Sequence, residues 1–355
     1  MTNQMKWYNK LLPLLCILLL NEAFASEPLI EKKKNISTSF GVDASDKINL
    51  DNQFGDIRIK FWDKAEVRID ITITSNAPDD EKAANFIKTV VIDSDKNTGG
   101  IFVKTHINSG SSKYTNNLSW KGKSEDKTQL RIDYQVSMPK NNALFVKNSF
   151  GNIYLPNFSA PLSVDENYGT LLAENITGNA HVDVAFGKAI IKSMKGGDLK
   201  VSYSTLEMEE AENVNINNSF GKLNIKEITN SESKISYSSG TIGTMKEMAK
   251  LKIDFSGGLK FSAIDKTLRE LEINSSYSSL TIPLDETQDY NFDVKVSYAD
   301  FDYPSNRTIS FTRNSDEEKK DKSYNPTKYY VGKIGKGNAD THIIIKSSFG
   351  SVKLK

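Results

Sequence analysis

A short aromatic motif repeats along this chain at a nearly constant spacing. An aromatic residue followed by Gly, Ser or Ala recurs nine times between residues 150 and 298. The aromatic positions are Phe150, Tyr168, Phe186, Tyr203, Phe220, Tyr237, Phe255, Tyr277 and Tyr298, so the steps are 17 or 18 residues at first and then 22 and 21. A fixed short period predicts an architecture in which each copy packs against the next.

The residues around each aromatic predict two strands per copy. An aliphatic residue stands four positions before most of the aromatics, as in Val146, Val164, Val182, Leu199, Ile216, Leu251, Ile273 and Val294, and Ser233 is the exception. Further apolar residues follow at three and five positions after it, as in Ile153 and Leu155. Strand side chains alternate with period two, so the change of parity places a corner just after the aromatic. Glycine tolerates positive φ and close backbone approach, so we expect Gly or Ser to form this corner.

Two strands per copy could form one hairpin or one turn of a parallel coil. The same residue class returns to the same offset in every copy, which favours stacking of like on like at the strand spacing of about 4.8 Å. The position three before the aromatic is polar throughout: Lys147, Asp165, Asp183, Lys200, Asn217, Lys234, Lys252, Asn274 and Lys295. The fold class is therefore predicted as all-β, a parallel β-solenoid with turns of 17–22 residues. We expect Phe150, Phe186, Phe220 and Phe255 to be buried and stacked between neighbouring turns, and Gly221→Val to destabilise more than Ser238→Val.

Two outlying copies divide the chain into regions. Residues 50–59 and 345–354 repeat the pattern around Phe54 and Phe349. The predicted regions are a signal peptide (1–25), a β-rich N-terminal region (26–140), the repeats (141–304), a charged, tyrosine-bearing loop (305–341) and a closing strand pair (342–355).

The N-terminal region is predicted to hold strands and one short helix. The strands are expected at Val67 to Ile73, Ile101 to Val103 and Leu130 to Val136, and the helix at Ala83 to Val90, after a proline and two acids. Residues 108–128 are expected to form an exposed loop, and Trp120 within it is interpreted as packing against the body rather than as a contact surface. Tyr324, Tyr329 and Tyr330 could bind a partner, but the favoured interpretation is that they hold the second loop to the repeats.

The N-terminus predicts export. Lys6 and Lys10 precede an apolar run, and a small-x-small site ends at Ala25. Cys16 lies inside the apolar run, so cleavage after Ala25 would leave no cysteine. Lipidation of Cys16 is not favoured, because Leu15 before it is larger than the residue that a lipoprotein signal carries there. The remaining chain would carry equal numbers of acidic and basic residues and no further apolar stretch long enough to span a membrane. This charge balance argues against a nucleic-acid partner.

Candidate catalytic residues do not form a recognisable constellation, so no catalytic, cofactor-binding or metal-ligating residue is predicted. His106, His181 and His342 are far apart in sequence, and the latter two occupy different offsets. Gly196-Gly197-Asp198 is similar to a calcium-binding nonapeptide but occurs once. Asp165 and Asp183 could lie on adjacent turns, and paired carboxylates can hydrolyse glycosides. Their column carries Lys and Asn elsewhere, which favours a solvated face.

The ordered series of motifs resembles a known family. Asn52-Gln53-Phe54-Gly55-Asp56-Ile57, Asn148-Ser149-Phe150-Gly151-Asn152-Ile153, Asn218-Ser219-Phe220-Gly221-Lys222-Leu223 and Ser347-Ser348-Phe349-Gly350-Ser351-Val352 look like the putative-adhesin family of secreted Gram-negative bacterial proteins, related to autotransporter-adhesin head domains. The resemblance covers nearly all of the chain after residue 25. It implies an exported β-solenoid and supplies no catalytic residues.

The sequence therefore predicts an exported, non-enzymatic protein of the periplasm, cell surface or medium. Its expected role is adhesion, envelope scaffolding or ligand binding, with an envelope protein or a glycan as partner. Two alternatives stay open: a polysaccharide-active enzyme, because parallel β-helices host lyases and glycosidases, and a periplasmic sensor or accessory protein.

Overall fold

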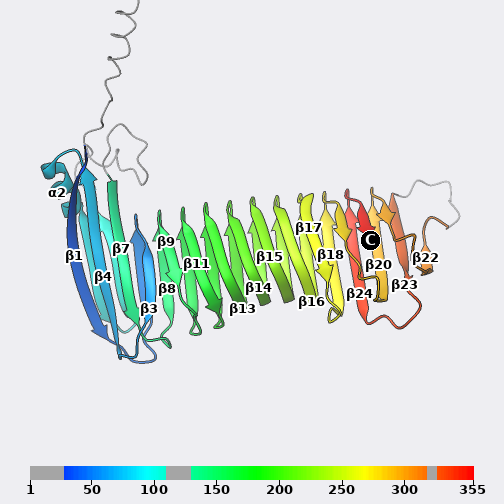
Figure 1. Cartoon of the computed structure of the whole chain (residues 1–355), viewed down its shortest axis with the longest axis horizontal. Coiled ribbons are helices and arrows are strands. Elements are labelled where there is room, and N and C mark those ends of the chain that lie inside the picture. The colour runs from blue at the N-terminus through cyan, green and yellow to red at the C-terminus, as the bar shows by residue number, and fades with distance from the viewer. Residues whose placement is uncertain (1–27, 109–128, 318–325) are drawn as a thin grey trace, which may run out of the picture.

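The computed structural model describes residues 28–108, 129–317 and 326–355. These residues form an elongated stack in which the strands run across the long axis (Figure 1). The described structure is nearly all β with one α-helix, α2 (Asp80–Thr89), as the sequence predicts.

The repeats build the body of the stack. Their strands are β8 (Leu144–Ser149), β9 (Asn152–Leu155), β10 (Leu162–Asn167), β11 (Thr170–Ile176), β12 (Ala180–Ala185), β13 (Lys188–Ser202), β14 (Thr205–Ser219), β15 (Lys222–Ser236), β16 (Ser239–Asp254), β17 (Gly258–Ile264), β18 (Glu270–Ser276), β19 (Leu280–Ile282), β20 (Tyr290–Ser297) and β21 (Phe301–Asp302). Successive copies pair in parallel and in register, so that Val164 lies between Val146 and Val182. This pairing excludes the hairpin alternative for the repeats.

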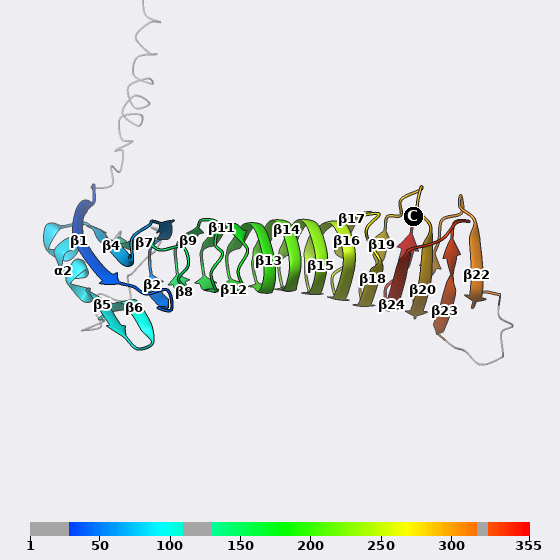
Figure 2. The ribbon, with the colours of Figure 1, turned by 90° about the horizontal axis from the view of Figure 1, so that it is seen from below.

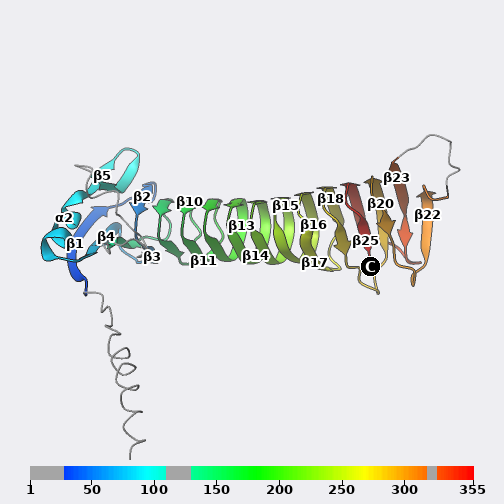
Figure 3. The same cartoon turned by 90° about the horizontal axis from the view of Figure 1, so that it is seen from above.

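Each repeat contributes to two sides of the stack. Side 1 consists of the strand segments that end at an aromatic residue, such as β8, β12 and β18, and side 2 of the segments that follow it, such as β9, β11 and β17 (Figures 2 and 3). The long strands β13 to β16 each run along side 2 and then along side 1 of the next repeat. Apolar side chains from both sides form one buried cluster between them. Their alternation with polar residues is what directs one face of each strand inward.

The N-terminal region first continues the parallel stack and then caps it with antiparallel pairs. Its elements are β1 (Ile30–Gly41), β2 (Ile48–Gln53), β3 (Ile57–Phe61), β4 (Glu66–Ala77), β5 (Val90–Asn97), β6 (Gly100–Ile107) and β7 (Gln129–Met138). On side 2 the order is β9, β3, β7, β4, β1, and on side 1 it is β8, β2, β6, β5.

Helix α2 closes this cap. It begins after the N-cap Asp79, whose carboxylate accepts the Lys82 N–H at 2.7 Å. Its buried residues Ala83, Phe86 and Ile87 match the predicted apolar face. The edge strand β1 was not predicted, because its run of Lys32, Lys33 and Lys34 hides the strand pattern. Lysines on an edge strand also discourage pairing with another chain.

The C-terminal region departs from the order of the sequence. Its strands are β22 (Ile309–Asn314), β23 (Thr327–Ile334), β24 (Thr341–Ser348) and β25 (Val352–Leu354). Strand β24 pairs in parallel with both β18 and β20, and β25 pairs with β19 and β21. The closing copy is therefore inserted between the last two copies of the series rather than added to the end.

The prediction of a loop over residues 305–341 is wrong for two segments. Strands β22 and β23 lie there and continue side 1, with β23 antiparallel to β20 and β22 antiparallel to β23. Tyr330 and Ile334 are buried, with 1% and 0% of their surface exposed. The run of charged residues that separates the two strands in the sequence obscured their short alternation of apolar and polar residues. Residues 318–325, with Tyr324, lie outside the described residues, as do the predicted signal peptide and Trp120.

Candidate functional site

The aromatic residues of the repeats form a continuous ladder of stacked rings. In spatial order they are Phe54, Phe150, Tyr168, Phe186, Tyr203, Phe220, Tyr237, Phe255, Tyr277, Phe349 and Tyr298, with neighbouring centroids 4.7–5.2 Å apart and ring planes within 9°. The stacking of like residues on neighbouring repeats is thus confirmed.

The predicted burial of these rings is wrong. Phe186, Phe220 and Phe255 are 46–49% exposed, and Phe150 is only partly buried. The reason is a left-handed backbone at the aromatic itself, for example φ 54° at Phe220, which breaks the strand alternation and turns the ring outward. Such a conformation costs about 1–2 kcal/mol for a non-glycine residue, while each stacked pair contributes about 0.5–1.5 kcal/mol. Stacking therefore offsets much of the strain.

The small residue after each aromatic has a different role from the one expected. The backbone angle of Gly187 or Gly221 is not left-handed. These glycines are required by close approach, because a Cβ on Gly221 would overlap the carbonyl oxygen of Ser204 in the preceding repeat. Where serine replaces glycine, its side chain closes the corner. Ser204 Oγ donates to the carbonyl oxygen of Ser202, two residues earlier, at 2.7 Å, and accepts a hydrogen bond from the Gly187 N–H of the preceding repeat at 2.9 Å.

Phenylalanine and tyrosine alternate along the ladder from Phe150 to Tyr298. In the sequence, Tyr277 and Tyr298 belong to consecutive copies of the motif, and the ring of Phe349 lies between them in space. Tyrosine hydroxyls therefore recur on every second repeat, about 9.6 Å apart at the usual strand spacing. Because each ring face inside the ladder is covered by the next ring, the ladder offers ring edges and hydroxyls, not faces, to a partner.

Side 1 carries two outward columns beside the ladder. The nearer column, one position before each aromatic, is rich in serine: Ser149, Ser202, Ser219, Ser236, Ser276, Ser348 and Ser297. The further column, three positions before, is the polar series predicted from the sequence, and its members are exposed or half-buried as expected. A groove of about 250 Å³ lies between these columns toward the C-terminal end.

The suspected carboxylate pair lies in the further column. Asp165 and Asp183 are directly opposite one another on β10 and β12. Each is also bonded to a lysine of a flanking repeat: Lys147 lies 3.3 Å from Asp165, and Lys200 lies 2.6 Å from Asp183. The aspartates are therefore members of an ion-paired row, as the solvated-face interpretation expects.

The histidines do not come together. His106 Nε2 lies 3.0 Å from Asp93 in the N-terminal cap, His181 Nδ1 lies 4.0 Å from Asp198 on side 1, and His342 is on β24. Gly196 and Gly197 have positive φ at the second corner of their repeat, where Asn213, Asn230 and Glu247 stand in the next repeats. Within residues 28–108, 129–317 and 326–355, no group of three His, Cys, Asp or Glu residues is placed to hold a metal ion.

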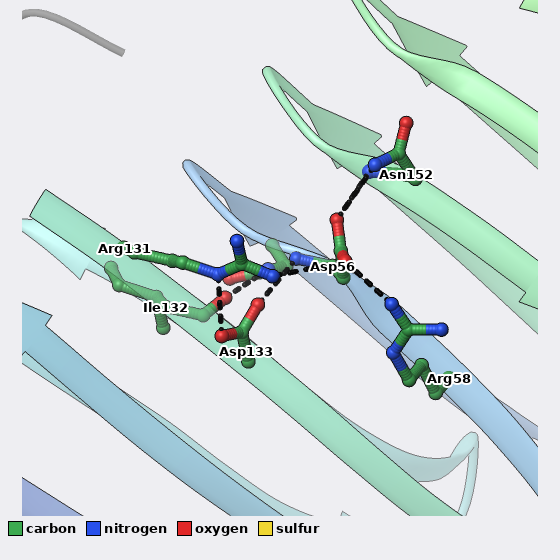
Figure 4. Close-up of polar contacts among 7 residues, drawn as sticks. Asp56, Arg58, Arg131, Ile132, Asp133 and Asn152 are labelled. Carbon is green, nitrogen blue, oxygen red and sulfur yellow. Dashed lines mark hydrogen bonds and ion pairs between the residues drawn. The ribbon is translucent and has the colours of Figure 1, made fainter. Parts of the chain in front are cut away.

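A polar network joins the N-terminal cap to the first repeat (Figure 4). Asp56 is almost fully buried and accepts hydrogen bonds from the backbone and side chain of Asn152 at 3.1 and 2.9 Å. Its other oxygen pairs with Arg58 at 2.9 Å and Arg131 at 3.0 Å. Asp133 accepts the Arg131 Nε–H and raises the pKa of that guanidinium. Sequence reasoning missed this network because its members come from three strands, β3, β7 and β9, and from the corner before β3, which are distant in sequence.

A buried carboxyl lies inside the stack. Glu166 is 0% exposed, and its Oε2 accepts only the Asn148 side chain, at 3.3 Å. Burial raises the pKa of Glu166 to about 9. Oε1 has no hydrogen-bond partner among the described residues. Glu166 is therefore protonated at neutral pH, and it is closed off from any ligand.

The tyrosines near the C-terminal end divide between core and surface. Tyr330 is buried, and its hydroxyl donates to Asp316 of the same segment at 3.0 Å. Its ring centroid lies 5.0 Å from that of Phe301 on β21, which supports the interpretation that it holds this segment to the repeats. Tyr329 is half-buried, with Lys295 5.5 Å and Arg313 4.3 Å from its ring centroid. Tyr330 therefore contributes to the core of the stack, whereas Tyr329 lies at its surface.

Comparisons with known proteins leave the family assignment open. No protein-family model and no curated protein matches the chain. Similar solved structures include a putative cell adhesion protein from Clostridium sporogenes, 11% identical, with TM-score 0.18, covering 91% of this chain and 99% of that one. Putative adhesins from Bacteroides fragilis and Parabacteroides distasonis are each 12% identical, with TM-scores of 0.32 and 0.28, covering 91% of this chain and 98% and 97% of theirs. At this level of similarity, function must be argued from the chain's own geometry.

The described residues include no helix that is both long enough and apolar enough to cross a membrane.

Proposed function

We propose that this protein is an exported β-solenoid that binds an extended surface partner, an adhesin-like role without enzymatic turnover. The single observation that supports it is the register of side 1. Repeat after repeat places a polar outward residue at the same height beside an exposed aromatic ladder. Such a rigid linear array matches a partner that is itself linear and repetitive.

The chemistry of the ladder narrows the mode of binding. Aromatic platforms that bind sugars or bases need free ring faces, and here every ring between the two ends of the ladder is covered on both faces by neighbours about 4.8 Å away. Recognition is therefore assigned to tyrosine hydroxyls and to the polar columns that flank the ladder. A partner held by many weak polar contacts gains affinity from their number, as in multivalent binding.

The enzyme alternative has less support. Asp165 and Asp183 share a column and lie opposite one another, but each has a lysine partner within 3.3 Å. The two carboxyls of a glycosidase must be free to contact the scissile bond, whereas here each carboxylate is held in an ion pair by a lysine on an adjacent strand. We therefore propose that neither residue acts as a catalytic acid.

The test is a binding and turnover screen with the purified protein. Labelled protein is applied to a glycan array and to Gram-negative envelope fractions, and the same glycans are assayed for new reducing ends and unsaturated products. Saturable binding without product is expected. Product formation that disappears in Asp165→Asn or Asp183→Asn would establish the enzyme alternative, and a folded protein that binds nothing in either panel would refute the proposed role.

A further inference from the structure

The C-terminal half of side 1 carries a row of lysines that form no ion pair with another described residue. In the column three positions before the aromatics, the residues on β15, β16, β18, β24 and β20 are Lys234, Lys252, Asn274, Lys346 and Lys295, each in register with the next. The insertion of β24 between β18 and β20 is what brings Lys346 beside Lys295. Distant parts of the sequence thereby form one basic row.

These lysines lack the partners found elsewhere in the same column. Lys147 and Lys200, nearer the N-terminal end, pair with Asp165 and Asp183. In contrast, Lys252 and Lys346 are exposed, and neither has a carboxylate within ion-pair distance among the described residues. Lys295 is half-buried and lies over the Tyr329 ring. Their charge is therefore available to a ligand.

A groove of about 250 Å³ runs between this row and the serine column. Its lining includes Lys252, Lys346 and Lys295 on one edge, with Ser276, Ser348 and Ser297 beside the ladder on the other. Ser276 and Ser348 lie directly opposite one another, and Ser348 lies opposite Ser297. Asp254 is the one carboxylate among the lining residues. Lysine ammonium groups thus line one edge of the groove and serine hydroxyls line the other, and the side chains that line the groove carry a net positive charge.

We propose that this groove, called here the lysine–serine strip, binds a linear acidic polysaccharide through its carboxylate or sulfate groups. The lysines attract the anions, the serines and Tyr277 can bond sugar hydroxyls, and the strand spacing of about 4.8 Å repeats these donors along the ligand. The assignment rests on the proposed binding role and names its ligand.

Two features favour a single acidic chain over a nucleic acid. The next outward column carries Lys250, Glu272, Ile344 and Asp293, so its one lysine is outnumbered by two acids and the positive charge does not broaden into the wide patch that a duplex requires. Single-stranded nucleic acid is held largely by base stacking on aromatic faces, and the faces of Tyr277 and Phe349 cover each other at 4.8 Å.

The experiment compares two charge-matched triple variants by calorimetry. One carries Lys252→Gln, Lys295→Gln and Lys346→Gln in the strip. The control carries Lys60→Gln, Lys222→Gln and Lys260→Gln, lysines that are exposed and without a carboxylate partner among the described residues. The probes are polygalacturonate, dextran sulfate, neutral dextran and a single-stranded oligothymidylate, each at low and high salt.

We expect the wild type to bind polygalacturonate or dextran sulfate, and the strip variant to bind at least about tenfold more weakly, a loss of about 1.4 kcal/mol. The control variant should stay within about twofold, and added salt should weaken the interaction because charges are paired. A second variant, Ser348→Asp, places a carboxylate in the strip and should give the same loss with every lysine in place. Circular dichroism confirms that each variant is folded.

Several results would overturn the assignment. Equal losses in the two triple variants would indicate diffuse charge attraction, and undiminished binding in the strip variant would place the ligand elsewhere. Tighter binding of oligothymidylate than of either acidic glycan would indicate a nucleic-acid site. Binding of neutral dextran or an envelope protein that survives in the strip variant would refute the strip while leaving the binding role intact, whereas absence of binding to every probe and fraction would refute both.

Discussion

Replacing the buried carboxyl of Glu166 should stabilise the protein at neutral pH. Glu166 is wholly buried with one weak hydrogen bond, and its pKa is raised from 4.5 to about 9 by burial. In the unfolded chain this carboxyl ionises near its ordinary value. Folding at pH 7 must therefore protonate it, which costs about 1.36 kcal/mol for each pH unit above 4.5, or about 3 kcal/mol.

The direction of the pH dependence follows from the raised pKa. The contribution of Glu166 to stability is fully present below pH 4.5, decreases as pH rises, and reaches its lowest value above about pH 9, where both states are ionised. Glu166→Gln removes this titration and keeps the shape of the side chain. Its amide could also donate to Asn148 Oδ1, which has no hydrogen-bond partner among the described residues.

The assay is urea unfolding followed by circular dichroism at pH values from 4.5 to 9. The free energy difference between Glu166→Gln and wild type should be smallest near pH 4.5, reach about 3 kcal/mol at pH 7 and grow further toward pH 9. Glu232→Gln, at an exposed position on side 1, is the matched control and should show no such slope. A difference that does not change with pH would refute the argument that Glu166 is buried in its neutral form.

The remaining predictions concern the ladder and its corner. Phe220→Ala should lower the free energy of unfolding by about 1–3 kcal/mol, because it removes the stacked contacts of a 46% exposed ring with Tyr203 and Tyr237. Ile225→Ala, in the core of the same repeat, should cost more, about 2–5 kcal/mol. The reverse order of the two losses in urea unfolding would contradict a surface ladder. Gly221→Ala should destabilise more than Ser238→Ala, because the new Cβ overlaps a backbone carbonyl, whereas Ser238→Ala removes hydrogen bonds worth about 1–3 kcal/mol; equal melting temperatures of the two variants would show that this glycine is replaceable.

The corner shows where sequence reasoning reached its limit. Parity indicated that each copy holds one irregularity near its aromatic but placed it just after that residue, whereas the left-handed residue is the aromatic itself. The pattern could not show that the left-handed residue is the aromatic, since non-glycine residues rarely adopt φ near 50°. The inward-facing parity of Phe220 therefore predicted burial, and the tertiary structure instead exposes the ring and stacks it.

The candidate site, too, was predicted only in part from the sequence. The polar column on side 1 was predicted from the sequence, because one offset carries one class of residue. Its free lysines were not predicted, because a lysine is free or paired according to the residue on the adjacent strand. Lys200 meets Asp183, whereas Lys346 lies between Asn274 and Lys295.

The sequence by itself determined the period, the two strands of each repeat and the parallel stacking of like on like, because these follow from local alternation repeated many times. The tertiary structure alone decided the order of the strands at the two ends, since pairing between distant segments leaves no periodic trace. Strand β24 lies between β18 and β20 because that position satisfies the backbone hydrogen bonds of both neighbours and continues the ladder from Tyr277 through Phe349 to Tyr298.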